Sequence, residues 1–427
     1  MAPALGIRIG PAWRVVGETE TIDTLLAEGW APDAVRRDRP RAEREAHVVL
    51  ERLIGLGLGV SVREGRRFFD PAEMINFALW ASQQHGDPFW SKVSVPNARH
   101  FVWRAHRLAP REHGPPPAPS TLPPRRFTVR LARRVALEGL APGTPVRLRL
   151  PRPIEGPALR DLELTMAPIE DATARVSSAE GRIDVRLSAP ASLSVELGYE
   201  ASFLAAPASV APEAPLSEAE RARYLRASEG LVRVTRPIAE LAARIAGEEA
   251  DPWAQVVRFW RFLLETTLGG AVDYDEIDLA RPQEWTIENR WTDCQMASAL
   301  LVALSRARAI PARLLRGYVL DEQGPYYHCW CEVWIAGRGW TPLDSVAWYF
   351  SDAGRDADWR DHYLGQLDYR MTTEQLPRLF AGLGEVRVPR GWMRLSRIED
   401  DGLTQSFHDR ATGAMIYSDR LSVLSRS

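Results

Sequence analysis

The chain has 427 residues, of which 45% are hydrophobic and 26% are charged, and its formal net charge at pH 7 is −2. This length allows two or three domains, and the small net charge excludes a general attraction to nucleic acid or to an anionic membrane surface. Three cysteines form no disulfide framework and favour a reducing compartment, so we expect a cytoplasmic protein without a signal peptide or a membrane span.

Residues 1–108 are predicted to form a mainly helical N-terminal domain. Apolar residues recur at helical spacing between Glu43 and Ile54, and Asp70 followed by Pro71 and Glu73 is a strong helix start. The aromatic residues after Asp70 favour a small helical core. A module that recognises a partner or a substrate is the alternative interpretation of this domain.

Residues 109–125 are rich in proline and are predicted to be an extended linker. Residues 126–205 then show short alternating segments, such as 146–150, 183–187 and 193–197, which predict an antiparallel β-sandwich. Residues 204–216, rich in alanine and proline, predict a second exposed connection. We expect trypsin to cut near Arg125 or Arg126.

A second folded region is predicted from residue 217 to residue 427. Ser217 and Glu220 form a capping box, and Asp251 before Pro252 marks another helix start. Helices are expected at about 218–228, at 236–247 and from Pro252 onward. The last segment, residues 391–423, reads as terminal strands of this same domain.

Three residues in this region have the types and the order of a cysteine-dependent catalytic site. Asp293 is a good N-cap, which places Cys294 in the first turn of a helix that must end before Pro311. A helix N-terminus favours a thiolate, an imidazole such as His328 can move the proton, and a carboxylate such as Asp344 can orient that imidazole. Strand alternation places His328 on the face opposite Cys329.

The motifs around these residues resemble those of the transglutaminase-like superfamily of cysteine enzymes. The matching pieces are Asp293-Cys294, 309–313 (AIPAR), Gly317-Tyr318, His328-x-Trp330-x-Glu332-Val333 and Gly339-Trp340-x-x-Leu343-Asp344. The resemblance extends more weakly over residues 217–370. Many members have glycine where this chain has Thr292.

The resemblance implies an α+β fold with a papain-like core, in which the cysteine-bearing helix packs on an antiparallel sheet. It also implies that Cys294, His328 and Asp344 are nucleophile, base and orienting acid. The indole of Trp291 is a candidate oxyanion donor, as in some family members, although core packing is the more ordinary role for it. Some bacterial relatives carry a β-domain ahead of the catalytic one.

The expected function is that of a cysteine-dependent enzyme that passes through a thioester. We expect hydrolysis of a peptide or amide bond, with a peptide, protein or carrier-bound acyl substrate. The alternatives are an acyltransferase that joins the acyl group to an amine in specialised metabolism, and a non-catalytic binding module. No cofactor is expected, and the cysteine spacing does not favour a metal site.

The ionisation of Cys294 can also be anticipated. The helix N-terminus and a nearby imidazolium favour the thiolate, whereas the adjacent Asp293 disfavours it. We therefore expect a Cys294 pKa below the usual value for a free thiol. Cys329 and Cys331 are expected to be buried and slow to react.

Overall fold

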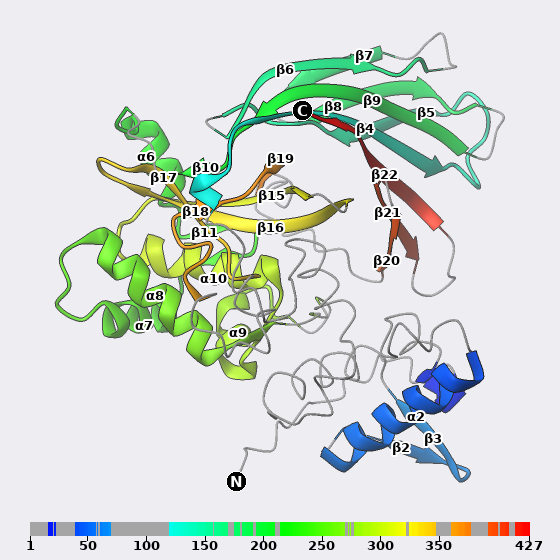
Figure 1. Cartoon of the computed structure of the whole chain (residues 1–427), viewed down its shortest axis with the longest axis horizontal. Helices are drawn as coiled ribbons and strands as arrows, with labels where there is room; N and C mark the ends of the chain where they lie inside the picture. Colours follow the sequence, from blue (N-terminus) through cyan, green and yellow to red (C-terminus); the bar gives the residue numbers. More distant parts are fainter. Residues whose placement is uncertain are drawn as a thin grey trace.

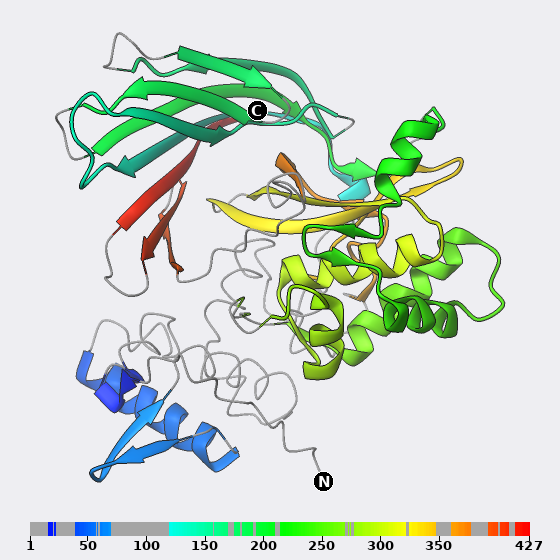
Figure 2. The same cartoon turned by 180° about the vertical axis from the view of Figure 1, so that it is seen from behind.

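The computed structural model describes most of the chain outside its first hundred residues. The described ranges are 16–19, 21–22, 39–56, 58, 60–69, 119–156, 158–169, 175–179, 182–190, 194–209, 214–269, 272, 274, 277–321, 324–346, 360–376, 392–399, 402–409 and 415–427. Figure 1 shows a large twisted β-sheet above a smaller sheet whose far side is covered by helices. Figure 2 shows the same layers from behind.

The described part of the N-terminal region combines one helix with a small sheet. Helix α2 (Arg39–Leu56) contains the predicted segment and buries Ala46, Leu50 and Leu53, whereas Val48 is 50% exposed. A three-stranded antiparallel sheet, not predicted from the sequence, has the order β1 (Val16–Gly17), β3 (Arg66–Phe69), β2 (Ser61–Arg63). The helix predicted after Asp70 lies outside the described residues.

The segment predicted to be a β-sandwich forms strands, as expected from its alternating pattern. A three-stranded sheet of order β5-β8-β7 faces a larger sheet that includes β4, β9 and β6. Buried side chains of both sheets, such as Val129, Val185 and Phe203, belong to one apolar cluster. The strands are β4 (Arg125–Ala136), β5 (Pro145–Pro151), β6 (Leu159–Met166), β7 (Arg175–Ala179), β8 (Arg182–Ser188) and β9 (Ser194–Ala205).

The terminal strands belong to the sandwich, contrary to the expectation that residues 391–423 are part of the second folded region. The larger sheet has six strands in the order β20-β21-β22-β4-β9-β6, with β20 (Trp392–Glu399), β21 (Gly402–Asp409) and β22 (Met415–Arg426). Strand β22 pairs antiparallel with β4, so Leu421 is the partner of Leu131. Pairing with β4 buries Leu421 in the sandwich core, which is the physical reason for this placement.

The region from residue 214 onward begins with helices, two of which start at their predicted caps. Ser217 and Glu220 form the capping box of α6 (Glu218–Tyr224), and the Asp251 carboxylate accepts a hydrogen bond from the Ala254 N–H at the start of α8 (Pro252–Thr266). The remaining helices are α7 (Arg236–Ala246), α9 (Pro282–Asn289) and α10 (Cys294–Ala307). Short strand pairs link them: β11 (Ser228–Glu229) with β12 (Val232–Arg233), and β13 (Leu268–Gly269) with β14 (Trp291–Thr292).

Helix α10 lies at the centre of this region. Every residue from Met296 to Arg306 is buried, and most of them are apolar. The charged exception, Arg306, is paired with Glu229. The helix packs against α7, α8, α9 and the sheet within one apolar cluster. A fully buried leucine contributes about 1.5–3 kcal/mol through the hydrophobic effect, so this packing fixes the position of the first turn firmly.

A four-stranded antiparallel sheet lies against α10. Its order is β17 (Gly339–Leu343), β16 (Gly324–Ile335), β15 (Ala312–Asp321), β19 (Arg370–Leu376). Cys331, Val333 and Ile335 of β16 belong to the cluster around α10, whereas Trp330 belongs to a separate cluster with Tyr363. Arg313 and Glu332, both from the family-like motifs, are cross-strand partners and form an ion pair.

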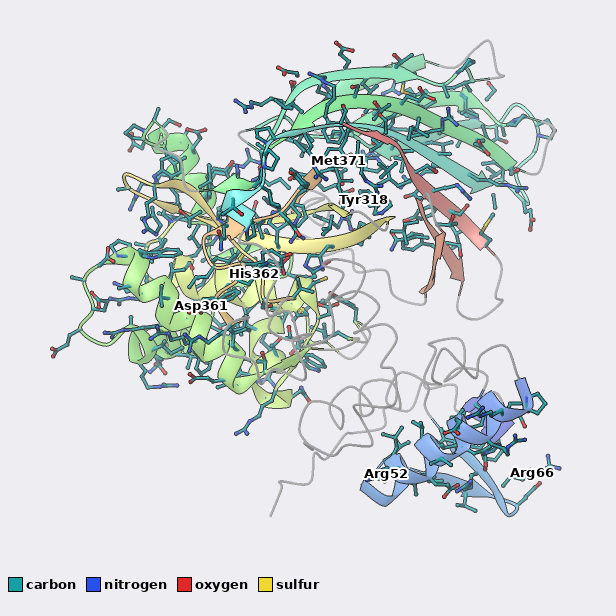
Figure 3. The ribbon with its side chains drawn as sticks, viewed as in Figure 1. Arg52, Arg66, Tyr318, Asp361, His362 and Met371 are labelled. Carbon is teal, nitrogen blue, oxygen red and sulfur yellow. The ribbon has the colours of Figure 1, made fainter. Side chains whose placement is uncertain are left out.

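The sandwich and the catalytic sheet share an apolar interface. Tyr318, Leu320 and Met371 belong to the same buried cluster as the sandwich strands. Figure 3 labels Tyr318 and Met371, which lie between the two sheets. Among the described residues, no helix combines the length and the apolar character that crossing a bilayer requires.

The described parts of the two predicted connections, residues 119–125, 204–209 and 214–216, include regular structure. Pro119 is buried at the start of a short 3-10 helix (η2, Pro119–Thr121), and the Tyr369 hydroxyl donates a hydrogen bond to the Pro123 carbonyl. Arg126 lies in β4 with its N–H and C=O both bonded to Ser427, so the trypsin site expected there is protected. Beyond β9, strand β10 (Ala208–Ser209) pairs with β18 (Gln366–Leu367).

Candidate active site

Cys294 is the first residue of α10, as the sequence predicted. The Asp293 carboxylate caps the helix, because its Oδ1 accepts a hydrogen bond of 2.8 Å from the Met296 N–H. Its Oδ2 accepts a second hydrogen bond of 2.8 Å from the Tyr274 hydroxyl. The Asp293 carboxylate is thus bonded to the helix end and to Tyr274. Cys294 itself is partly exposed.

His328 and Asp344 meet through the far nitrogen of the imidazole ring. His328 lies on β16 and is 4% exposed, and Asp344 directly follows β17 and is 3% exposed. The His328 Nε2 is 2.9 Å from Asp344 Oδ1 and 2.8 Å from Oδ2. The predicted pair therefore forms between neighbouring antiparallel strands, and it leaves Nδ1 as the ring nitrogen available to another group.

The thiol of Cys294 is that other group. Charge interaction and a side-chain hydrogen bond with His328 both act on Cys294, and the same interactions act on His328 in return. The structure thus brings Cys294, His328 and Asp344 together in the order that the motifs suggested. Gly317, the Cα partner of His328 on β15, allows close strand packing here, because a side chain at this position would collide with the Met371 carbonyl.

The environment of Cys294 opposes the expected lowering of its pKa. A hydrogen bond with the Cys329 thiol and burial raise the pKa of Cys294 well above the usual value, and the charge of His328 only partly counteracts them. The sequence analysis missed the Cys329 contribution, because strand alternation placed that thiol opposite His328. Cys329 is buried, as expected, and its sulfur also lies 3.8 Å from Gln295 Oε1 of α10.

His328 holds its proton strongly. Burial alone would lower its pKa, but the negative charge of Asp344 and the sulfur of Cys294 outweigh burial and raise the pKa of His328 to about 10. Burial raises the pKa of Asp344, but His328 and Arg370 outweigh this and lower it overall. His328 therefore keeps its proton more strongly, and Cys294 gives up its proton less readily, than the same side chains do in water.

Two charged residues beyond the motifs complete the surroundings of Asp344. Arg370 Nη2 lies 3.1 Å from Asp344 Oδ2, and Arg370 Nε lies 2.6 Å from Asp368 Oδ1. The sequence analysis noted residues 364–370 as resembling a segment of bacterial relatives but gave them no role. The signal was the presence of two oppositely charged residues, Asp368 and Arg370, between the apolar residues Leu367 and Met371, because charged residues are rarely buried unless they are paired.

The other predicted site features stand as follows. The backbone of Trp291 lies in β14 beside Leu268, but its side chain lies outside the described part, so its role as an oxyanion donor stays a prediction. Cys331 is fully buried beneath α10, and burial raises the pKa of its thiol. In the described ranges, no group of three or more His, Cys, Asp or Glu residues is arranged to hold a metal ion.

Comparisons with solved structures give distant similarities. A candidate cysteine protease from Cytophaga hutchinsonii aligns with 16% identity and a TM-score of 0.41, covering 72% of this chain and 90% of that chain. The periplasmic domain of TgpA from Pseudomonas aeruginosa aligns with 16% identity and a TM-score of 0.32, covering 59% and 90%. Red sea bream transglutaminase aligns with 11% identity and a TM-score of 0.27, covering 63% and 68%.

The family comparison is specific to the region that carries the site. A search of curated proteins found no match. The family model of the transglutaminase-like superfamily matches residues 239–345, a span that begins in α7 and ends one residue after Asp344. Cys294, His328 and Asp344 all lie inside it. Residues 239–345, the part of the chain that carries the site, therefore match the transglutaminase-like superfamily.

Proposed function

We propose that the protein is a cysteine-dependent amidase or protease in which Cys294 is the nucleophile, His328 moves the proton and Asp344 orients His328. The observation that carries this proposal is the position of His328, which is bonded through Nε2 to Asp344 and interacts with the thiol at the start of α10. This is the geometry that nucleophilic catalysis by a thiol requires.

The reactive form of the site is the Cys294 thiolate beside the His328 imidazolium. Its thiolate attacks the carbonyl carbon, a C–S bond forms, and the carbonyl electron pair moves to oxygen. When the C–N bond breaks, the leaving amine takes the His328 proton and a thioester remains. A water molecule then gives a proton to His328 as it attacks the thioester, and the thiolate leaves as the acid forms.

Hydrolysis is the reaction we favour, because it needs no second pocket for an acceptor. The proposed substrates are peptides, proteins or carrier-bound acyl groups. If an amine takes the place of water in the second half of the cycle, the same residues form an amide bond instead. Because the three cysteines of the chain are free thiols, we also propose a reducing, cytoplasmic location.

The test uses the full chain with p-nitrophenyl acetate as acyl donor, with and without methylamine. A hydrolase gives acetate in both cases and a transient acetyl group on Cys294 in intact-protein mass spectrometry. N-methylacetamide as the main product would instead identify an acyltransferase. Cys294→Ala should abolish the adduct and the turnover, and Cys331→Ala is the matched control that should retain both. Unchanged turnover in Cys294→Ala would overturn the proposal.

A further inference from the structure

We propose that Arg370 is a positioning residue of this site, which keeps the Asp344 carboxylate charged and correctly turned while His328 gains and loses its proton. The inference rests on the proposed roles of His328 and Asp344 and adds a fourth residue, with Asp368 as its counter-ion. Arg370 is the first residue of β19, which pairs with β15, and it is 2% exposed.

The guanidinium of Arg370 joins two carboxylates. Its Nη2 lies 3.1 Å from Asp344 Oδ2, which is also the oxygen 2.8 Å from His328 Nε2. Its Nε lies 2.6 Å from Asp368 Oδ1. The other Asp344 oxygen, Oδ1, accepts a hydrogen bond of 3.0 Å from the Val346 N–H. Asp344 is thus held by groups on both of its oxygens, independently of His328.

Aromatic rings hold the guanidinium in place. The Arg370 guanidinium carbon lies 5.5 Å from the centre of the Trp330 ring and 5.2 Å from the centre of the Tyr363 ring, distances at which a cation is attracted to the ring face. The Tyr363 hydroxyl also donates a hydrogen bond of 2.6 Å to Asp368 Oδ2. Arg370 and its counter-ion therefore share one rigid aromatic support.

The segment that carries Tyr363 is tied to the helical side of the domain. The Trp260 indole N–H of α8 donates to the Asp361 carboxylate at 3.2 Å, and Figure 3 shows Asp361 and His362 beside the helices. The Asp344 N–H bonds the Tyr363 carbonyl at 3.3 Å. The geometry around Asp344 is consequently fixed by backbone as well as by charge.

The arrangement balances charge through the whole catalytic cycle. Imidazolium, Asp344, Arg370 and Asp368 alternate in sign, so the buried cluster is neutral when His328 is protonated. When His328 becomes neutral, a buried Asp344 without Arg370 would have no cation beside it and would tend to take up a proton. With Arg370 present it stays a carboxylate and accepts the Nε2–H of His328, so that Nδ1 is the ring nitrogen that acts as the base toward the Cys294 thiol.

The titratable and charged groups that act on His328 or Arg370 are Cys294, Asp344, Asp368, His362 and Tyr363, and Cys329 acts on Cys294. Among them His362 is mostly buried, and burial lowers its pKa, so it adds no charge near neutral pH. Removing Arg370 therefore leaves Asp368 as an unbalanced negative charge, which should strengthen proton binding at both His328 and Cys294.

The experiment measures the rate at which iodoacetamide alkylates Cys294 between about pH 5 and 10, with peptide mass spectrometry as the readout. Arg370→Gln should raise the pH midpoint by about one unit, and Asp368→Asn should lower it by a smaller amount. The double variant removes both charges and should return close to the wild-type midpoint. Arg370→Lys keeps the positive charge but loses the planar guanidinium that contacts both carboxylates. The pH midpoint of alkylation should therefore stay the same, whereas turnover of p-nitrophenyl acetate should fall.

A purely structural role would not give this pattern. Equal midpoints for wild type, Arg370→Gln and Asp368→Asn would overturn the inference. If Arg370→Gln fails to fold, Asp368→Asn and Arg370→Lys decide by the same criteria. These outcomes differ from failure of the proposed function, which would appear as undiminished turnover in Cys294→Ala whatever the midpoints are.

Discussion

The two halves of the candidate site treat charge in opposite ways. Around Cys294, burial and the Cys329 thiol disfavour a negative sulfur, and the nearby Asp293 charge is held by Met296 and Tyr274. Around His328, Asp344 and Arg370 place full charges in contact within the protein interior. The difference teaches that both the thiol and the imidazole hold their protons more strongly than usual. Alkylation of Cys294 should therefore become faster as the pH rises above neutrality.

The largest expected effect comes from removing the imidazole. His328→Ala should lower turnover of p-nitrophenyl acetate by about 10²–10⁴-fold, because it removes the imidazole that interacts with the Cys294 thiol and moves its proton. It should also raise the pH midpoint of Cys294 alkylation more than any other substitution. The measurement is steady-state turnover together with alkylation against pH. A variant with wild-type turnover would show that His328 is not the proton carrier.

Asp344→Asn should have the next largest effect. The amide cannot stabilise the imidazolium and would place a neutral group beside the buried Arg370, so turnover should fall by at least about 100-fold. Cys294 should remain alkylatable, with a pH midpoint that rises less than in His328→Ala. Near-UV circular dichroism serves as the folding control. If folded Asp344→Asn had unchanged turnover, the orienting role would be refuted.

Cys329→Ala tests the other half of the comparison. Because the Cys329 thiol raises the pKa of Cys294, its removal should lower that pKa, and alkylation should reach half its maximum rate at a lower pH. Cys331→Ala is the matched control, since Cys331 contacts the Leu343 carbonyl instead and should leave the midpoint unchanged. A midpoint that moves upward in Cys329→Ala would contradict the stated cause.

Tyr274→Phe should have the smallest effect. It removes the hydroxyl that donates to Asp293 Oδ2 and keeps the ring, so the Asp293 charge acts more strongly on the neighbouring Cys294. We expect a small upward shift of the alkylation midpoint, of a few tenths of a pH unit at most. The comparison variant is Tyr363→Phe, which removes the hydroxyl that donates to Asp368 on the His328 side of the site. Alkylation that becomes faster at neutral pH in Tyr274→Phe would be the opposite result.

Local signals in the sequence predicted the features that depend on neighbouring residues. Asp293 and Asp251 cap helices as expected, because a cap is formed within one turn. The strand that carries His328 was recognised from its alternation and from its motif. Cys294, His328 and Asp344 were found because each lies in a short motif, and the structure brings all three together.

Features that depend on distant partners could not be predicted in the same way. The pairing of β22 with β4 joins segments separated by hundreds of residues, and nothing in either alternating pattern names its partner. The contact between Cys294 and Cys329 depends on how α10 lies against β16, which strand alternation alone does not determine. Arg370 reaches Asp344 only because β19 pairs with β15 in the folded sheet.

The six-stranded sheet has a mechanical consequence for the region that carries the candidate site. The chain leaves this sheet after β9, forms the whole catalytic region, and returns to it through β20, β21 and β22, so the catalytic region is an insertion with two covalent tethers. The first tether is further pinned where β10 pairs with β18. Because Tyr318, Leu320 and Met371 are buried in one cluster with the sandwich strands, any movement of the inserted region relative to the sandwich must expose this apolar interface to water.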